Sequence, residues 1–131
     1  MARAAFESAL AYSKERQAFG QPIFNHQAVQ FKLADMATQI EAARQLIWHA
    51  ASLKDAGRPC LKEAAMAKLN ASEMQSRLLD EFLQLHGGYG YMSEYLVGTA
   101  WVDARVGRIY GGSSEVMKEI IARAICDEPK R

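Results

Sequence analysis

The most constraining feature of this 131-residue sequence is a regular spacing of apolar residues over residues 29–50. Their intervals alternate between four and three, and the set is Val29, Leu33, Met36, Ile40, Ala43, Ile47 and Ala50. Because residues three and four apart share one helix face, this alternation predicts a single long helix that packs along its whole length. No proline or glycine interrupts the sequence between Pro22 and Gly57.

A second apolar stripe predicts a second long helix that ends at Gly87-Gly88. Its members are Ala64, Ala67, Ala71, Met74, Leu78, Phe82 and Leu85. Between the stripes, Gly57 can take the left-handed conformation that ends a helix, and Pro59 can open the next one. At about 1.5 Å per residue, the helices would be roughly 45 Å and 40 Å long. We therefore expect an antiparallel helical hairpin.

Shorter helices are expected on either side of this hairpin. Residues 2–14 carry small residues on one stripe, and residues 116–125 form an apolar face behind Ser113, a suitable N-cap. Residues 93–109 fit either a strand or a helix. We favour a helix there, because a lone strand in a helical chain has nothing to pair with. The predicted fold class is thus all-α, an antiparallel bundle of four or five helices.

Composition narrows the class of protein further. Lys and Arg total 16 against 15 Asp and Glu, and this balance gives no support to a nucleic-acid-binding protein. No apolar run approaches the roughly 18 residues of a membrane span, and the first residues lack the apolar stretch of a signal peptide. Two cysteines are too few for a disulfide framework. We expect one soluble, cytoplasmic domain.

Three segments interrupt the helical pattern, and each combines residue types that can contact a ligand. Residues 16–27 join a cation, an aromatic ring and a glycine-proline turn, whereas residues 84–91 place three glycines beside two tyrosines. Residues 109–115 lead into a predicted helix N-terminus, which can accept an oxyanion or a phosphate. Taken singly, each segment is equally an ordinary turn or helix end.

Taken together, the three segments resemble the C-terminal helical domain of acyl-CoA dehydrogenases. The motifs are Arg-x-x-Phe-Gly-x-Pro-Ile from Arg16, Gln-x-x-Gly-Gly-x-Gly-Tyr from Gln84, and Ile-Tyr-Gly-Gly-Ser-Ser-Glu from Ile109. The resemblance covers residues 2–124. Enzymes of this family also have an N-terminal helical domain and a middle β-domain. We therefore expect residues 1–131 to be the C-terminal domain of a larger enzyme, inactive when isolated.

The resemblance implies FAD as the cofactor and an acyl-CoA thioester as the substrate. The family oxidises the Cα–Cβ bond: a glutamate removes the α-proton while a hydride passes from Cβ to FAD. Arg16 matches the arginine that contacts the FAD pyrophosphate, and the segment that begins at Gln84 reaches the FAD of a neighbouring subunit. The positions that match FAD contacts are Arg16, Phe19, Gln27, Gln84, Gly87, Gly88, Ser113 and Glu115.

Gly111 departs from the commonest pattern of the family. Many members have the catalytic glutamate here, and a glycine cannot take a proton. Members that resemble the long-chain and isovaleryl types also lack an acid here and carry the base on an earlier helix, whose equivalent lies just upstream of Met1. We therefore expect no catalytic residue in this chain. Substrate contacts are expected at Tyr110, Gly111 and Gly112, where a backbone amide can bind the thioester carbonyl.

Polar residues outside the motifs are given structural roles. The three histidines have no cysteine or carboxylate at ligand spacing, so we expect no metal site. His86 could still contact the cofactor, because it adjoins the glycine segment. The glutamates of the two long helices, namely Glu41, Glu63, Glu73 and Glu81, are expected on solvated faces.

Other functions stay open from the sequence. Flavin monooxygenases and acyl-CoA oxidases of the same superfamily use these helices, and a helical interaction module without chemistry has the same periodicity. The resemblance also implies a role in fatty acid metabolism, assembly into homodimers or homotetramers, and electron-transferring flavoprotein as electron acceptor. From the charge balance and the absence of a long apolar run, we expect neither nucleic-acid nor membrane binding.

Overall fold

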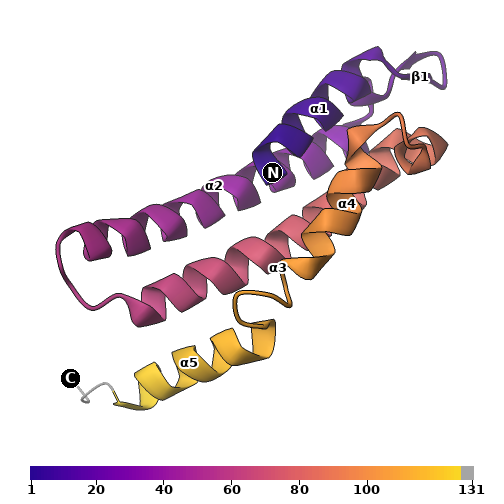
Figure 1. Cartoon of the computed structure of the whole chain (residues 1–131). Helices are drawn as coiled ribbons and strands as arrows, with labels where there is room; N and C mark the ends of the chain where they lie inside the picture. Colours follow the sequence, from indigo (N-terminus) through magenta and orange to yellow (C-terminus); the bar gives the residue numbers. More distant parts are fainter. Residues whose placement is uncertain (128–131) are drawn as a thin grey trace.

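The computed structural model describes residues 1–127, which form five α-helices and a short β-hairpin (Figure 1). The α-helices are α1 (Ala2–Glu15), α2 (Gln27–Asp55), α3 (Leu61–His86), α4 (Leu96–Val106) and α5 (Ser114–Asp127). The hairpin strands are β1 (Gln17–Ala18) and β2 (Gln21–Pro22), and two short 3-10 helices are η1 (Ile23–Asn25) and η2 (Gly87–Tyr91). The predicted all-α class is confirmed.

The two long helices form the predicted antiparallel hairpin (Figure 1). Gly57 ends α2 with a φ of 64°, and its N–H donates to the Lys54 carbonyl oxygen at 3.0 Å. Helix α3 begins at Leu61, two residues after Pro59, and ends immediately before Gly87. Residues 93–109, which the sequence left ambiguous, contain helix α4.

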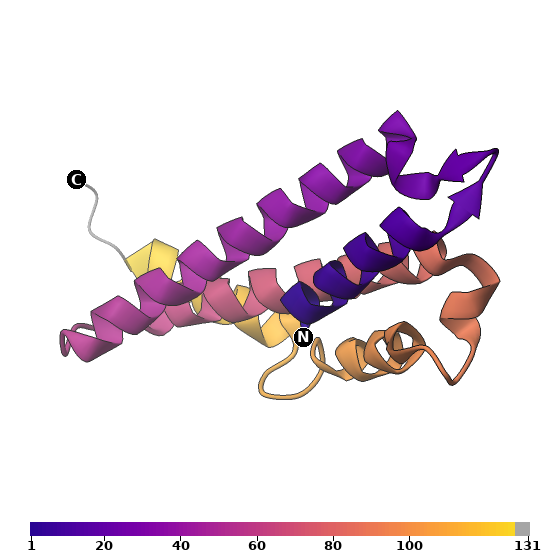
Figure 2. The same cartoon turned by 90° about the horizontal axis from the view of Figure 1, so that it is seen from above.

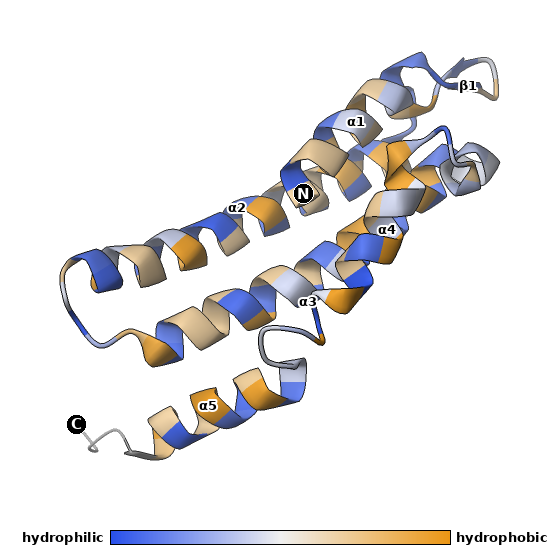
Figure 3. Ribbon diagram, viewed as in Figure 1, coloured by the Kyte–Doolittle hydropathy of each residue, from blue (hydrophilic) through white to orange (hydrophobic). Residues whose placement is uncertain are grey.

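Helix α3 is the central element of the bundle. It packs against α1, α2, α4 and α5 (Figure 2). Its buried side chains include Leu78, Leu79 and Phe82, and the Phe82 ring meets Phe6 of α1 edge-to-face at 6.2 Å. Apolar and hydrophilic segments alternate along the helices (Figure 3), and the apolar residues that pack with α3 in the core come mainly from α1, α2 and α4.

One part of the predicted α2 stripe is wrong. Leu33, Met36, Ala43 and Ala50 are buried as expected, whereas Ile47 is 47% exposed. Helix α1 runs beside the first half of α2 only (Figure 2). The second half of α2 therefore packs mainly on α3, and Ile47 lies at the edge of that contact.

The hairpin between α1 and α2 was not predicted as strands. Gln17 pairs with Pro22 and Ala18 with Gln21 in antiparallel register. The two turn residues, Phe19 and Gly20, have φ angles of 54° and 80°. Positive φ at both central positions is the conformation that joins two antiparallel strands most tightly. The glycine of the Arg-x-x-Phe-Gly motif thus makes this turn.

Large apolar side chains remain exposed on the outer faces of α2 and α4, and we expect the isolated chain to self-associate. Phe31 and Trp48 lie on α2, and Leu96 and Val102 on α4. Exposed apolar surface of this extent is typical of a contact face. Sedimentation at micromolar concentration should show dimers or larger species, and a sharp monomer would contradict the prediction.

Within residues 1–127, no helix combines the length and the apolarity that crossing a bilayer requires.

Candidate functional site

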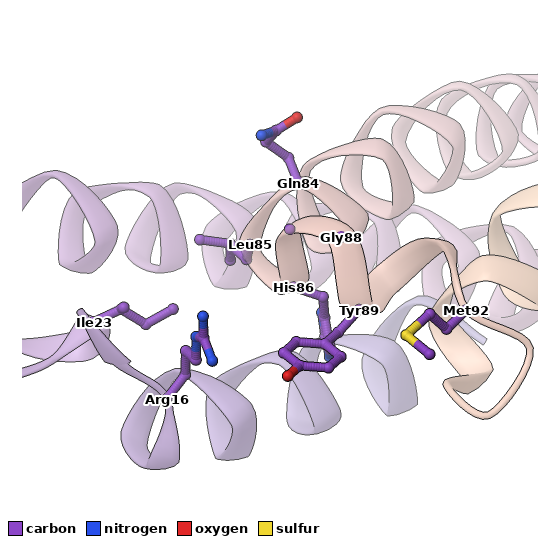
Figure 4. A pocket seen from close by; sticks show the side chains of 9 residues that line it. Arg16, Ile23, Gln84, Leu85, His86, Gly88, Tyr89 and Met92 are labelled. Carbon is purple, nitrogen blue, oxygen red and sulfur yellow. The ribbon is translucent and has the colours of Figure 1, made fainter.

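A cavity of about 490 Å³ lies where α1 ends and α3 ends (Figure 4). Two motifs that are far apart in the sequence line it together. The lining residues are Arg16, Ile23, Gln84, Leu85, His86, Gly87, Gly88, Tyr89 and Met92. The structure therefore brings together four of the predicted cofactor residues: Arg16, Gln84, Gly87 and Gly88.

The backbone of Arg16 is hydrogen-bonded on both sides, whereas its guanidinium has no carboxylate partner among the described residues. Its N–H donates to the Tyr12 carbonyl oxygen, and its own carbonyl oxygen accepts from the Ile23 N–H, both at 2.8 Å. The guanidinium lies 5.4 Å from the centre of the Tyr89 ring. Among the described residues it forms no ion pair. A guanidinium at a cavity with no carboxylate partner among the described residues is suited to a phosphate group.

The end of α3 supplies bare backbone at the same cavity. Gly87 has a φ of 60° and ends the helix, with its N–H donating to the Gln84 carbonyl oxygen. A Cβ built at Gly87 or at Gly88 would meet nothing within 4 Å. A ligand can therefore approach this backbone closely, although the Gln84 amide itself points away from Arg16 (Figure 4).

Packed aromatic rings support the Gly87–Gly88 turn at the end of α3. His86 is buried, stacks on Tyr12 at a ring-centre distance of 4.2 Å, and meets Tyr95 edge-to-face. Its Nδ1 lies 2.8 Å from the Phe82 carbonyl oxygen. Because a carbonyl can only accept, Nδ1 carries the proton. The Tyr12 hydroxyl donates to the His86 carbonyl oxygen at 3.2 Å.

Phe19 and Gln27 lie at this end of the bundle but outside the cavity lining. Phe19 is on the hairpin turn, is 96% exposed, and meets His26 edge-to-face at 6.0 Å. Gln27 is exposed at the first position of α2. The cofactor contacts predicted for these two residues stay predictions.

The third motif forms a separate group between α4 and α5. Tyr110 and Gly111 are exposed and line a hollow together with Met1, Lys68 and other residues of α3 and α4. Gly111 and Gly112 both take left-handed conformations, with φ angles of 65° and 97°. The φ of 97° at Gly112 is a conformation that residues with a side chain rarely adopt, so the turn favours glycine there.

Ser113 caps α5 as predicted. Its Oγ accepts from the Val116 N–H at 3.4 Å. The backbone N–H of Glu115 and, secondarily, the Ser113 hydroxyl hold the pKa of the Glu115 carboxyl below its ordinary value. Glu115 is therefore an anion at the start of a helix, a position that favours negative charge.

The two groups are held apart by the length of α3. Glu73 contacts the third motif through Ser114, whereas Gln84 lies at the Arg16 cavity. These two α3 residues are separated by about 16 Å along the axis, at about 1.5 Å per residue. Apart from Phe19 and Gln27, the predicted site residues therefore fall into two separate groups, called half-sites below: Arg16, Gln84, Gly87 and Gly88 form one, and residues 110–115 without Ser114 form the other.

The sequence analysis missed the residues that anchor the third motif. Glu73 was expected on a solvated face, but its Oε1 accepts from Arg108 Nε at 2.8 Å and from Ser114 Oγ at 2.6 Å. Lys68 donates to the Gly112 carbonyl oxygen. Arg108 and Ser114 are distant from Glu73 in the sequence, and the packing of α5 on α3 brings them together.

No group of three or more metal-ligating side chains occurs in residues 1–127. The half-sites consist instead of a guanidinium, exposed glycine backbone and a capped helix N-terminus. Each of these features can contact an anionic group.

Comparison with known proteins identifies the class. Residues 1–126 match the family model described as acyl-CoA dehydrogenase, C-terminal domain. The chain belongs to this family.

Curated relatives are similar over nearly the whole chain. "Probable acyl-CoA dehydrogenase YngJ" of Bacillus subtilis is 53% identical over 95% of this chain and 33% of its own length. "Acryloyl-CoA reductase (NADH)" of Anaerotignum propionicum is 47% identical over 95% of this chain and 32% of its own length. The chain thus spans about a third of the length of these relatives.

Solved structures share the fold closely. Butyryl-CoA dehydrogenase from Megasphaera elsdenii is 44% identical with a TM-score of 0.93, over 95% of this chain and 33% of that one. A structure titled "FAD complex of PigA" is 30% identical with a TM-score of 0.91, over the same shares of the two chains.

Proposed function

We propose that this chain is the C-terminal, FAD-contacting domain of a flavoenzyme that oxidises the Cα–Cβ bond of acyl-CoA thioesters. The observation that carries the proposal is the Arg16 cavity. It combines a guanidinium that has no ion-pair partner within residues 1–127 with the open backbone of Gly87 and Gly88, and both features suit a pyrophosphate. Bound FAD would supply the hydride acceptor for the reaction.

The separation of the half-sites supports a cofactor shared between subunits. The segment from Gln84 resembles one that reaches a neighbouring subunit's FAD, and Arg16 lies in the same cavity. Both would therefore serve the partner's FAD. Ser113 and Glu115, on the other half-site, would serve the FAD of their own subunit. Assembly as a homodimer or homotetramer follows from this arrangement.

The proton chemistry is assigned to a residue that precedes Met1 in the enzyme. Met1 lines the same hollow as Tyr110 and Gly111, and Gln75 Nε2 lies 2.9 Å from its sulfur. A carboxylate on a preceding helical turn would thus emerge beside Gly111. The backbone N–H of the Gly111–Gly112 turn would bind the thioester oxygen and stabilise the charge that develops there.

An anaerobic titration tests the proposal. The FAD-loaded enzyme that carries this chain is mixed with saturated acyl-CoA thioesters of several chain lengths. We expect at least one of them to bleach the flavin absorbance and to yield the 2-enoyl-CoA product, identified by mass. A flavin that stays oxidised with every thioester would contradict the proposal.

The relatives also support a second candidate, the reverse reaction. Acryloyl-CoA reductase, named for reduction of an enoyl thioester, is 47% identical to this chain. The same titration distinguishes the direction when the pre-reduced enzyme is mixed with enoyl-CoA and the two rates are compared. Electron-transferring flavoprotein is the proposed redox partner in either direction. Oxygen as acceptor, as in the oxidase and monooxygenase alternatives, would instead give hydrogen peroxide or an oxygenated product in air.

A further inference from the structure

The turn between α4 and α5 is anchored at its base by one carboxylate. Glu73 Oε1 accepts from Arg108 on one side of the turn and from Ser114 on the other, at 2.8 and 2.6 Å. The Ser114 N–H also donates to the Arg108 carbonyl oxygen at 3.1 Å. Ser114 is only 4% exposed. The two ends of the turn are therefore tied both to each other and to α3.

A second contact from α3 holds the tip of the turn. The Lys68 ammonium donates to the carbonyl oxygen of Gly112, one of the two consecutive left-handed glycines. Lys68 and Glu73 are five positions apart on α3 and reach opposite parts of the same turn. Lys68 thus limits the backbone freedom that two glycines would otherwise give.

The residues expected to touch ligand contribute little to holding the turn. Tyr110 is exposed, and a Cβ at Gly111 would meet nothing within 4 Å. The position of the Gly111 backbone therefore depends on the anchors rather than on its own packing. The anchors are also strong. The hydrogen bond from Ser114, with help from Arg108, keeps the pKa of Glu73 below its ordinary value against partial burial, so its hydrogen bonds are charge-assisted at neutral pH.

We propose that Glu73 and Lys68 are positioning residues, which hold the 108–114 turn where its backbone meets the acyl thioester and Ser113 meets the flavin. This inference rests on the proposed function. In this proposal, Glu73 and Lys68 of α3 determine how the thioester and the flavin are aligned, although neither side chain contacts the thioester or the flavin.

The test uses the FAD-loaded enzyme with Glu73→Ala, Glu73→Gln, Lys68→Met and Ser114→Ala. Gln keeps an acceptor oxygen in the same place, so it serves as the conservative variant. Glu81→Ala is the matched control: Glu81 lies on the same helix and pairs with Lys32 of α2, away from the turn. FAD content and melting temperature are measured first, and Lys68→Met and Ser114→Ala keep the test decisive if Glu73→Ala does not fold.

The expected result is a loss of rate without a loss of cofactor. A misplacement of about 1 Å can lower a rate about 100-fold, so Glu73→Ala should slow the limiting rate of flavin reduction by about 10- to 100-fold. Glu73→Gln should recover most of that loss, and Glu81→Ala should match the unmodified enzyme. Amide hydrogen exchange over residues 110–116 should rise in the anchor variants only.

Two results would overturn the inference. One is flavin reduction in Glu73→Ala, Lys68→Met and Ser114→Ala as fast as in Glu81→Ala. The other is unchanged amide exchange in the turn. If the unmodified enzyme is reduced by no thioester, the proposed function fails instead. The amide exchange then decides the anchoring of the turn on its own.

Discussion

Replacing Glu115 by Gln should leave abstraction of the substrate α-proton intact in the enzyme that carries this chain. Replacing the acidic residue that precedes Met1 should abolish it. Glu115 is four residues beyond Gly111, the position where many relatives have the base, and it lies in the first turn of α5. Its pKa is lowered by its own backbone N–H and by Ser113. A carboxylate with a lowered pKa is a weaker base.

The measurement is rapid-mixing absorbance of the flavin with acyl-CoA. Loss of a general base slows proton transfer by about 100- to 10,000-fold, so the upstream Glu→Gln variant should show almost no bleaching. Glu115→Gln should bleach with less than about a tenfold change, through an altered flavin contact alone. The assignment of the base is wrong if the Glu115 variant loses bleaching while the upstream variant keeps it.

Arg16→Ala should weaken FAD binding by about 10- to 150-fold, because a charge-assisted hydrogen bond contributes about 1.5–3 kcal/mol. Stability should change little, since the guanidinium forms no ion pair with a described residue and the backbone hydrogen bonds of Arg16 survive truncation. Titration of the apoenzyme with FAD, followed by flavin fluorescence, gives both dissociation constants. The 131-residue chain alone should bind FAD weakly, because it holds only part of each site.

Arg123→Ala is the control for this experiment. Arg123 pairs with Glu119 on the exposed face of α5, so its loss should leave FAD affinity unchanged. Equal FAD affinities for Arg16→Ala and Arg123→Ala would remove Arg16 from the cofactor site.

The helices could be predicted from the sequence because the apolar residues of each buried face repeat with the helical turn within that segment. The alternating stripe from Val29 to Ala50 reflects packing that repeats with the helical turn. The burial of Ile47 was predicted wrongly because its exposure depends on how far α1 extends along α2. The spacing of apolar residues within α2 carries no information about that. The sequence predicts a glycine-proline turn here, whereas the chain turns at Phe19 and Gly20 and Pro22 belongs to β2. Strands of two residues are too short to show a period.

The site was predictable only in part. The motifs give the residue types, and the structure adds that Arg16 and the Gln84–Gly88 segment share one cavity while residues 110–115 lie elsewhere. Glu73 could not be found from the sequence, because a glutamate on a helix that pairs with distant residues has the same local pattern as a solvated one. Its role depends on the packing of α5 against α3.

Subunit complementation tests the central claim most directly, namely that the two half-sites of one chain serve two different flavins. Arg16→Ala impairs one half-site, and Gly112→Val impairs the other because a β-branched residue is strained at the left-handed φ of 97°. Neither homodimer should reduce its flavin efficiently at limiting FAD. In a mixed dimer, one site would carry both defects and the other none.

The two variants are unfolded, mixed in equal amounts and refolded with FAD, and flavin reduction by acyl-CoA is measured. Random pairing makes half the dimers mixed, with one intact site in each, so we predict recovery of about a quarter of the unmodified activity. If both half-sites of a chain served the same flavin, every site would carry one defect. No recovery above the separate variants would then be seen, and that result would contradict the account.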